Sequence, residues 1–377
     1  MSKAKRNVLI VNHSYKSPFK ELDVQYARVF NPDRYAITIV YLTGTPSPDE
    51  IADVYPYDTI FLKLKKKDIR NLKLGAIREL RALCRKKCFA VAICHRYKPT
   101  YIMYWSTRAH RIPILISVMH DFRTLRRLSH KVFVYFFLRQ RFVFAGVSDA
   151  IREDLYRDGW GLKRDQVITL PNSIEVQETV KKQLNFKMAR KLLRLSTETF
   201  VLGTVGRLHP AKDHLTLIHA VALAIESGLD IQLVIIGEGP LEDALQRTIS
   251  HHGLEEHVVL TGYIPEASRL MRAFNIYVSS SRKEPFGMVL LEAMAADLPI
   301  IATAVDGVPQ VLGDCGTLVP PADSVALAEA IKAYCRKPPE ELAALGRLAR
   351  RRLDENFTTE KFQQTFWHHF TPKGLTP

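Results

Sequence analysis

The stretch FVLGTVGRLHPAKDHLTLIHAVALAIESGLDIQLVIIGEGP, residues 200–240, decides the fold. It opens with the apolar run FVLGTV, passes through a loop with cations, continues with apolar residues at helical spacing and ends in a second apolar run, IQLVII. Two such runs joined by a helix-sized spacer are typical of parallel strands buried on both faces. We therefore expect a strand, helix, strand unit here.

The same alternation of short apolar runs and helix-sized segments extends over most of the chain. Further runs lie at residues 7–12, 36–42, 101–105, 112–118, 141–148, 257–262, 276–281 and 299–304. They predict an α/β protein with two doubly wound, Rossmann-like domains. We expect an N-terminal domain over residues 1–175, a C-terminal domain over 176–355, and a final helix within 356–377 that packs back across the seam.

The composition excludes disordered, fibrous and collagen-like proteins, because the 377 residues are 47% hydrophobic and 25% charged. The formal net charge is +15, from 54 Lys and Arg against 39 Asp and Glu. Residues 1–150 hold 28 of the basic and 11 of the acidic side chains, so the positive charge belongs to the N-terminal half. Such a charge distribution suits an anionic partner.

The cysteines and the apolar runs bear on the compartment. Five cysteines are an odd and sparse set, which predicts free thiols in a reducing environment. The apolar stretch near the N-terminus runs only from Val8 to Val11, too short for a signal-peptide core or a membrane span. We expect a cytoplasmic protein without a transmembrane helix.

Ligands of doubly wound sheets bind at the carboxyl ends of strands, so the loops that follow strands are the candidate sites. The loop after residues 200–205 begins with Gly206 and Arg207 and carries Lys212 just before a predicted helix. Glycine lets the backbone approach a ligand, and two cations suit one anionic group such as a diphosphate. An ordinary basic surface loop is the alternative.

The loop GEGP at residues 237–240 follows the next strand. It lacks the third glycine of a dinucleotide fingerprint, because Glu242 stands at that position, and the acidic turn after it disfavours a pyrophosphate. We interpret it as a structural tight turn.

The segment SSSRKEPFGMVLLEAMAADLP, residues 279–299, is the most informative of the three loops. Pro285 favours the start of a helix, and Gly287 leaves the first-turn amides open to a ligand. Glu284 precedes this helix and Glu292 lies inside it, so two carboxylates can accept hydrogen bonds from sugar or ribose hydroxyls. A residue that only favours the helix dipole is the alternative for Glu284.

Together these motifs resemble the retaining glycosyltransferases of family 4, which have the two-domain GT-B fold. The resemblance extends roughly over residues 7–370. It rests on Gly206-Arg207 with Lys212, GEGP at 237–240, EPFGMVLLE at 284–292 and DGVPQVLGDCGTLVPPAD at 306–323. Weaker matches are His120-Asp121, VSDAIREDL at 147–155 and LPNSI at 170–174.

The resemblance implies two Rossmann-like domains that face a central cleft, with a nucleotide-sugar donor bound to the C-terminal domain. Arg207 and Lys212, beside Gly206, would bind the diphosphate, and Glu292 the ribose hydroxyls. Glu284 and the backbone of the three residues after Pro285 would contact the donor sugar and its phosphate, namely Phe286, Gly287 and Met288. The expected catalytic residues are Arg207, Lys212 and Glu284, with His120 of the N-terminal domain on the donor sugar.

The sequence departs from the family's pattern at two positions. Family members usually carry a glycine-rich loop after the first strand, whereas the first glycine here is Gly44, and the side chains of Lys16, Ser17 and Lys20 would substitute for it. The family's common Glu after the Gly-Val-Pro turn is Gln310.

We expect neither a metal nor another cofactor. No Asp-x-Asp triplet occurs in the sequence, so chelation of the donor through a metal is unsupported. Cations and helix N-terminal amides can stabilise a departing diphosphate without one. The resemblance implies retention of the anomeric configuration, with the leaving phosphate taking the acceptor's proton.

The basic half has its densest cluster of cations at residues 63–87. Ile77, Leu80, Cys84, Cys88 and Val91 recur there at three- and four-residue spacing, which predicts a helix with an apolar stripe and a basic remainder. Such a helix suits a membrane surface or an anionic glycolipid acceptor, and a solvated face that binds nothing is the alternative. The candidate contacts are Lys16, Lys65, Lys66, Lys67, Arg81 and Arg85.

The leading hypothesis is a glycosyltransferase that moves a sugar from a nucleotide-sugar to an anionic glycan or glycolipid. Lipopolysaccharide core or another cell-surface glycan, made at the inner face of the cytoplasmic membrane, is the expected product. A nucleotide-sugar epimerase of the same fold and a soluble transferase for a small metabolite are the alternatives. A nucleic-acid-binding protein that uses the basic half for phosphate contacts is a minor alternative. Nucleic acid is not an expected partner, because aromatic RNA-binding motifs and Cys/His finger spacings are missing.

Overall fold

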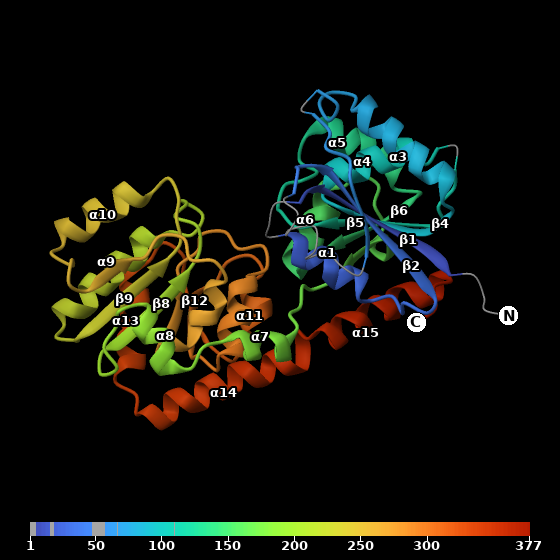
Figure 1. Ribbon diagram of the computed structural model, residues 1–377. Coiled ribbons are helices and arrows are strands. Elements are labelled where there is room, and N and C mark those ends of the chain that lie inside the picture. The colour runs from blue at the N-terminus through green and yellow to red at the C-terminus, as the bar shows by residue number, and fades with distance from the viewer. Residues whose placement is uncertain (1–4, 16–18, 47–56, 66, 109) are drawn as a thin grey trace. The chain divides into compact units, whose positions relative to one another are not determined.

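The computed structural model describes residues 5–15, 19–46, 57–65, 67–108 and 110–377 (Figure 1). The chain divides into two compact units: unit 1 is Met1–Asn172 with Phe362–Pro377, and unit 2 is Ser173–Lys361. Each unit has one parallel sheet with helices packed against it (Figure 1). The predicted class, α/β with two doubly wound, Rossmann-like domains, is confirmed.

The sheet of unit 1 has the strand order β3-β2-β1-β4-β5-β6-β7. Its strands are β1 (Arg6–Ser14), β2 (Tyr35–Thr43), β3 (Asp58–Phe61), β4 (Phe89–His95), β5 (Ile114–Met119), β6 (Phe142–Gly146) and β7 (Val167–Thr169). Successive strands extend to one side from β1 and to the other side from β4. The topological switch point, where such sheets bind ligands, is therefore between β1 and β4.

The helices of unit 1 connect and cover these strands. They are α1 (Phe19–Ala27), α3 (Leu74–Lys86), α4 (Tyr97–Ser106), α5 (Leu128–Phe133) with a π-helical continuation (Val134–Leu138), and α6 (Asp149–Asp158). The core strands are apolar on both faces, as in β1, where residues 8–11 have no exposed surface. This double burial explains why their sequences read as continuous apolar runs rather than as alternating ones.

The sheet of unit 2 has the order β10-β9-β8-β11-β12-β13. Its strands are β8 (Phe200–Val205), β9 (Ile231–Ile236), β10 (Val258–Leu260), β11 (Ile276–Ser279), β12 (Ile300–Thr303) and β13 (Thr317–Val319). The unit's helices are α7 (Val176–Lys182), α8 (Phe186–Leu192), α9 (His214–Glu226), α10 (Glu242–His251), α11 (Met288–Ala295), α12 (Val308–Leu312), α13 (Ser324–Cys335) and α14 (Pro339–Asn356). The switch point of this sheet lies between β8 and β11.

The last helix, α15 (Thr359–Phe370), contributes aromatic side chains to unit 1. Phe362 meets Tyr26 with ring centroids 4.9 Å apart, and Phe366 meets Phe30 at 5.5 Å. All three phenylalanines of α15, Phe362, Phe366 and Phe370, are buried. Burial of each such side chain is worth roughly 1.5–3 kcal/mol, so these contacts hold the C-terminal segment firmly on unit 1.

Two local predictions were wrong, and both lie around β4. The run YIMYW, expected as a strand, belongs to α4, whereas the strand itself is the preceding segment FAVAICH. The predicted apolar stripe also ends early, because α3 stops at Lys86, Cys88 is exposed and Val91 lies on β4. Aromatic residues favour strands only weakly, and here their burial within α4 outweighs that preference.

No helix in the part of the chain that the structure describes is long and apolar enough to cross a membrane.

Candidate functional site

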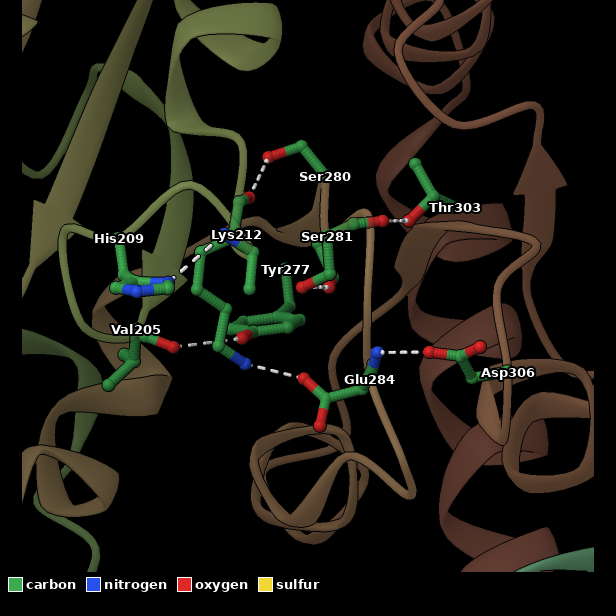
Figure 2. Close-up of polar contacts among 11 residues, drawn as sticks. Val205, His209, Lys212, Tyr277, Ser280, Ser281, Glu284, Thr303 and Asp306 are labelled. Carbon is green, nitrogen blue, oxygen red and sulfur yellow. Dashed lines mark hydrogen bonds and ion pairs between the residues drawn. The ribbon is translucent and has the colours of Figure 1, made fainter. Parts of the chain in front are cut away.

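Two loops meet at the switch point of unit 2, because β8 and β11 are neighbouring strands. The backbone amides of Arg282 and Lys283 donate to the carbonyl of Ala211 at 2.8 and 3.2 Å. The Ser280 hydroxyl donates to the Lys212 carbonyl at 3.0 Å (Figure 2). These bonds join the loop after β8 to the loop after β11, so the side chains that both loops present are fixed relative to each other.

The two loops bring together a cation and a carboxylate that lie far apart in the sequence. The Nζ atom of Lys212 is 2.5 Å from Oε2 of Glu284 (Figure 2). The two side chains are 27% and 15% exposed, so the pair is accessible to a ligand but partly shielded from water. A charge-assisted bond of this kind in a partly desolvated loop is stronger than a surface ion pair.

Further bonds hold each partner of this pair. The Glu284 amide donates to the carboxylate of Asp306 at 2.9 Å (Figure 2), and its carbonyl accepts from Gly307 at 3.1 Å. Next to Lys212, Asp213 adopts the left-handed conformation with φ 49° and accepts from Arg282 Nε at 2.6 Å. The pair is thus preorganised by the folded loops.

Glycines in the loop after β9 allow it to approach the loop after β8 closely. A Cβ atom at Gly206 would lie 3.4 Å from Cε of Lys212, in van der Waals contact with the lysine side chain. A Cβ atom at Gly237 would lie 2.0 Å from the Gly206 carbonyl, and one at Gly239 would lie 2.5 Å from the Leu208 carbonyl. The GEGP turn therefore acts as packing beneath the Gly206 loop, which agrees with its interpretation as a structural turn.

Helix α11 begins next to Glu284 with open first-turn amides. Its N-cap, Gly287, has φ 98°, and no side chain caps the helix or places an acidic group in its first turn. The Phe286 side chain is buried against Phe357, with ring centroids 5.8 Å apart, so this residue can offer only its backbone to a ligand. Helix N-terminal amides of this kind favour anions.

The charges of Glu284 and Glu292 both affect the phenol group of Tyr277. Burial raises the pKa of Tyr277 well above its usual range, and the charges of both glutamates raise it further. Glu292 is half-buried, and Arg207 is exposed. Within the described residues, no hydrogen bond or ion pair ties the Arg207 guanidinium, so this cation is available to a ligand.

A small hollow behind the ion pair is lined by polar side chains that include Lys212, His214, Tyr277 and Glu284. Burial and the charge of Lys212 lower the pKa of His214 to about 4, so the imidazole is neutral at physiological pH. Its Nδ1 atom is buried and has no hydrogen-bond partner among the described residues.

In unit 1, His120 lies directly after β5, and it is only 7% exposed. Its Nε2 atom is 2.9 Å from Nδ1 of His95, and the two rings are stacked with centroids 5.2 Å apart. Burial, together with His95 and Arg96, lowers the pKa of His120 well below its usual value. His120 is therefore a neutral imidazole with one nitrogen already engaged.

His120 also lines a hollow of about 370 Å³, which we call the cationic pocket. Its positively charged lining consists of Lys73, Arg96, Lys98 and Arg127, and its one carboxylate is Asp121. Burial and the charge of Lys98 lower the pKa of Lys73, which shows that the cations repel one another. The remaining lining residues are Tyr97, Met119, His120, Thr124 and His130.

The sequence of unit 2 matches a known family model. Residues 199–337 match the glycosyl transferases group 1. This glycosyl transferase segment contains the ion pair Lys212–Glu284, Arg207 and all of α11.

A curated relative is similar over part of the chain. The phosphatidyl-myo-inositol mannosyltransferase of Mycobacterium leprae is 35% identical over 180 residues, which are 46% of this chain and 47% of that protein. The chain spans about half the length of the first curated relatives that it matches.

Two solved structures are similar over nearly the whole chain. A glycosyltransferase from Rickettsia africae has a TM-score of 0.84 at 15% identity, over 98% of each chain. Anabaena Alr3699/HepE in complex with UDP and glucose has a TM-score of 0.76 at 19% identity, over 98% of this chain and 99% of that one. The fold is therefore GT-B.

The predicted donor residues are distributed around the glycosyl transferase segment's switch point. The structure brings Gly206, Lys212 and Glu284 into direct proximity, with α11 starting alongside. Met288 is the first residue of α11, and Glu292 lies one turn further along it. His120 belongs to unit 1 and the other predicted catalytic residues to unit 2.

The predicted acceptor or membrane residues that the structure describes, namely Lys65, Lys67, Arg81 and Arg85, do not line the cationic pocket. Lys65, Lys67 and Arg85 are exposed, and Arg81 donates to the Trp105 carbonyl at 3.0 Å, a contact between α3 and α4. Lys16 and Lys66 lie outside the described residues, as does Ser17, and the side chain of Lys20 is also not described.

Sequence reasoning missed Arg96 and Lys98. Both follow β4, the strand that was not recognised, so the rule that sites lie at strand ends was not applied there. The signal was present, because HRYK directly follows the apolar run FAVAIC. Lys73 was noted only as part of the basic cluster.

Within the described ranges, no three His, Cys, Asp or Glu side chains lie together as a metal site would require.

Proposed function

We propose that this protein is a retaining glycosyltransferase that needs no metal and moves a sugar from a nucleotide-sugar to an anionic glycan or glycolipid. The observation that carries the proposal is the Lys212–Glu284 pair at the switch point of unit 2, within the segment that matches the glycosyl transferases group 1. A cation for a diphosphate next to a carboxylate for sugar hydroxyls fits a nucleotide-sugar.

Each site residue has a role in this proposal. Lys212 and the exposed Arg207 neutralise the diphosphate, and the open amides of α11 donate hydrogen bonds to one of its oxygens. Glu284 accepts hydrogen bonds from the donor sugar, and Glu292 accepts them from the ribose. Fixed cations and amides stabilise the negative charge that develops on the leaving diphosphate, which accelerates transfer.

The acceptor class follows from the cationic pocket in unit 1. Among the described residues, four cations and one carboxylate line a hollow of about 370 Å³, which favours a ligand that carries phosphate or carboxylate groups. The name of the Mycobacterium leprae relative gives phosphatidyl-myo-inositol, a phosphate-bearing lipid, as the molecule that it mannosylates. An anionic glycolipid or a phosphorylated glycan of a lipopolysaccharide or another cell-surface polysaccharide is our proposed acceptor.

Exposed apolar side chains near this pocket support peripheral binding to the inner face of the cytoplasmic membrane. Leu72 and Leu74 flank the pocket residue Lys73, and Leu128 follows Arg127. Phe136 is also exposed, on the π-helical continuation of α5. Apolar and cationic side chains on one surface are typical of proteins that bind anionic lipid surfaces.

The donor is tested by thermal unfolding of the purified protein with UDP-, GDP- and ADP-sugars, with and without EDTA. A ligand that binds only the native state raises the melting temperature by mass action. We expect a rise with one nucleotide series that EDTA leaves unchanged and that Glu292→Ala abolishes. Absence of a rise with every nucleotide contradicts the proposal.

The transfer itself is tested with the donor found in this way and a panel of phosphorylated glycolipids in detergent. Proton NMR of the product gives the anomeric configuration, and we expect the configuration of the donor. Turnover of the donor into an epimer without any acceptor would replace the proposal with an epimerase.

A further inference from the structure

The ion pair of Lys212 and Glu284 joins two side chains that the proposed function assigns to different parts of the donor. Nζ of Lys212 donates to Oε2 of Glu284 at 2.5 Å (Figure 2). Within the described residues, this is the only hydrogen bond or ion pair that either side chain makes. A diphosphate that takes Lys212 as its partner therefore competes with the Glu284 carboxylate.

The backbones of both residues are fixed, so this competition involves side chains only. The Glu284 amide donates to Asp306 at 2.9 Å, and the Glu284 carbonyl accepts from Gly307 at 3.1 Å. The Lys212 carbonyl accepts from the Ser280 hydroxyl at 3.0 Å. None of these bonds involves Nζ of the lysine or the carboxylate of the glutamate, so the pair can open while both loops stay in place.

Opening of the pair on a diphosphate gives the ammonium group a new partner and leaves the carboxylate with none. The Glu284 side chain is only 15% exposed, and a carboxylate that loses its cation in such a place regains little hydration. Tyr277 lines the same hollow, but its hydroxyl already donates to the Val205 carbonyl at 3.5 Å. Glu284 therefore needs hydrogen-bond donors from the ligand.

We propose that Glu284 is a specificity-determining residue that lets Lys212 bind the diphosphate of a nucleotide-sugar and disfavours a nucleoside diphosphate without its sugar. The inference rests on the proposed function, in which Lys212 binds the diphosphate and Glu284 the sugar. A nucleotide-sugar brings hydroxyl donors to Glu284 when its diphosphate takes Lys212, so both side chains are paired again. A nucleoside diphosphate supplies no such hydroxyls, and its binding leaves the carboxylate unpaired. The pair thus weakens binding of the product of transfer relative to the donor.

Arg207 offers a comparison within the same site. Its guanidinium is exposed and makes no hydrogen bond or ion pair within the described residues. Arg207 therefore binds a diphosphate without breaking a contact of the protein. We expect it to strengthen binding of both ligands by the same factor, whereas Glu284 changes the ratio of their affinities.

The first experiment is titration calorimetry of UDP, GDP and ADP with the wild-type protein and Glu284→Gln. Glutamine keeps the size of the side chain and its capacity to accept hydrogen bonds from hydroxyls, but it does not hold Lys212 by charge. We expect the variant to bind the diphosphate preferred by the wild type about tenfold more tightly, which corresponds to about 1.4 kcal/mol. An unchanged or weaker affinity overturns the proposal.

The control for a change of charge alone is Glu238→Gln. Glu238 is exposed on the turn beneath the Gly206 loop, and within the described residues it pairs with no cation. Its replacement should change the affinity for the same diphosphate by less than about threefold, because an exposed charge is screened by water and salt. A gain equal to that of Glu284→Gln overturns the proposal.

A double-mutant cycle separates the exchange of Lys212 from simple repulsion between the carboxylate and the diphosphate. In the Lys212→Ala background, Arg207 remains to bind the diphosphate, but Glu284→Gln has no cation to release. We therefore expect Glu284→Gln to change the affinity there by no more than about twofold. The same tenfold gain in both backgrounds would mean that Glu284 only repels the diphosphate, and it would overturn the proposal.

The nucleotide-sugars of the same base complete the test. We expect the ratio of the Kd of the nucleoside diphosphate to that of the nucleotide-sugar to fall about tenfold in Glu284→Gln and to stay unchanged in Arg207→Ala. If the wild-type protein binds neither ligand of any base, the proposed function fails and this inference with it. If it binds and transfers the sugar while Glu284→Gln leaves the ratio unchanged, only this inference fails.

Discussion

The two units use the same sheet topology but equip their switch points in opposite ways. In unit 2, glycine-rich loops bring a cation and a carboxylate to the surface, and their backbone bonds do the positioning. In unit 1, the corresponding position is filled by buried polar side chains, namely Asn12, Asp23, His95 and His120, which contact one another in sequence. The loops of unit 2 present charged side chains to a ligand, whereas unit 1 buries most of its ionisable side chains at this position.

The largest expected effect is in unit 2. Lys212→Ala removes the partner of Glu284. In the proposed function, it also leaves the diphosphate of the donor one cation short. We expect kcat to fall by roughly two to three orders of magnitude, the scale of a preorganised charge-stabilising group. Steady-state kinetics with saturating donor measures it.

The control for this variant is an ion pair of the same kind away from the switch point. Lys337 and Glu341 form an i,i+4 pair at 3.0 Å near the start of α14. Lys337→Ala breaks it and should leave kcat within a factor of two of the wild type. Full activity of Lys212→Ala would remove Lys212 from the donor site.

We expect acidification to change the unfolding free energy in opposite directions through His214 of unit 2 and Asp23 of unit 1. The pKa of His214 in unit 2 is lowered to about 4, so the unfolded state takes up a proton below about pH 6.5 that the folded state refuses, and acid destabilises. The pKa of Asp23 in unit 1 is raised to about 7, so the folded state binds the proton first, and acid stabilises. Each contributes on the order of 2 kcal/mol between pH 7.5 and 5.

Denaturant unfolding at pH 7.5 and pH 5 separates these contributions. We expect His214→Gln to shrink the loss of unfolding free energy on acidification, and Asp23→Asn to enlarge it. All three tryptophans lie in unit 1, at positions 105, 160 and 367, so fluorescence follows that unit while far-UV circular dichroism follows both. The same sign for both variants would contradict the stated pKa shifts.

Local pattern was sufficient to predict both sheets and to place Gly206, Lys212 and Glu284 in loops that connect a strand to a helix, because each motif is contained in one such connection. The roles of these residues in a donor site stay a prediction. His120 was also found as a strand-end residue. Its partners His95 and Asp23 were not, since only the strand order brings α1, β4 and β5 together.

Strand order is what the periodicity of a sequence does not encode. The segment FAVAICHRYK carries both a strand and two pocket cations, but the aromatic run after it competed for the strand assignment. Because of this error, the more numerous cations of α3 were predicted as candidate contacts, and Arg96 and Lys98 were not. A cluster of charge is visible in one stretch of sequence, whereas a pocket is built by residues from several elements.

Backbone packing at the switch point of unit 2 is tested by Gly237→Ala. The added Cβ would lie 2.0 Å from the Gly206 carbonyl, at a φ of +151°. We expect a loss of about 1–3 kcal/mol in unfolding free energy and a smaller thermal shift with the donor, because the Gly206 loop must move. Gly228→Ala, which has a φ of +91° and nothing within 4 Å, isolates the cost of the backbone conformation. An equal loss in both variants would mean that the contact with Gly206 does not matter.

The smallest expected effect is a gain in unfolding free energy rather than a loss, and it concerns the cationic pocket of unit 1. Arg96 has φ 75° and ψ 165°, a conformation that only glycine adopts readily. Its guanidinium is 3.6 Å from the exposed Asp121 carboxylate, a contact too solvated to compensate for such strain. We therefore expect Arg96→Gly to raise the unfolding free energy by about 1 kcal/mol.

The same substitution should weaken binding of an anion, because the pocket loses one of four cations. Titration calorimetry with inorganic pyrophosphate should show about a tenfold loss of affinity, which corresponds to about 1.4 kcal/mol. Lys63 is also left-handed, with φ 49°, but it does not line the pocket. Lys63→Gly should therefore raise the unfolding free energy and leave the affinity for pyrophosphate unchanged. If Arg96→Gly lowers the unfolding free energy, or leaves the affinity for pyrophosphate unchanged, the backbone strain at Arg96 serves packing rather than anion binding.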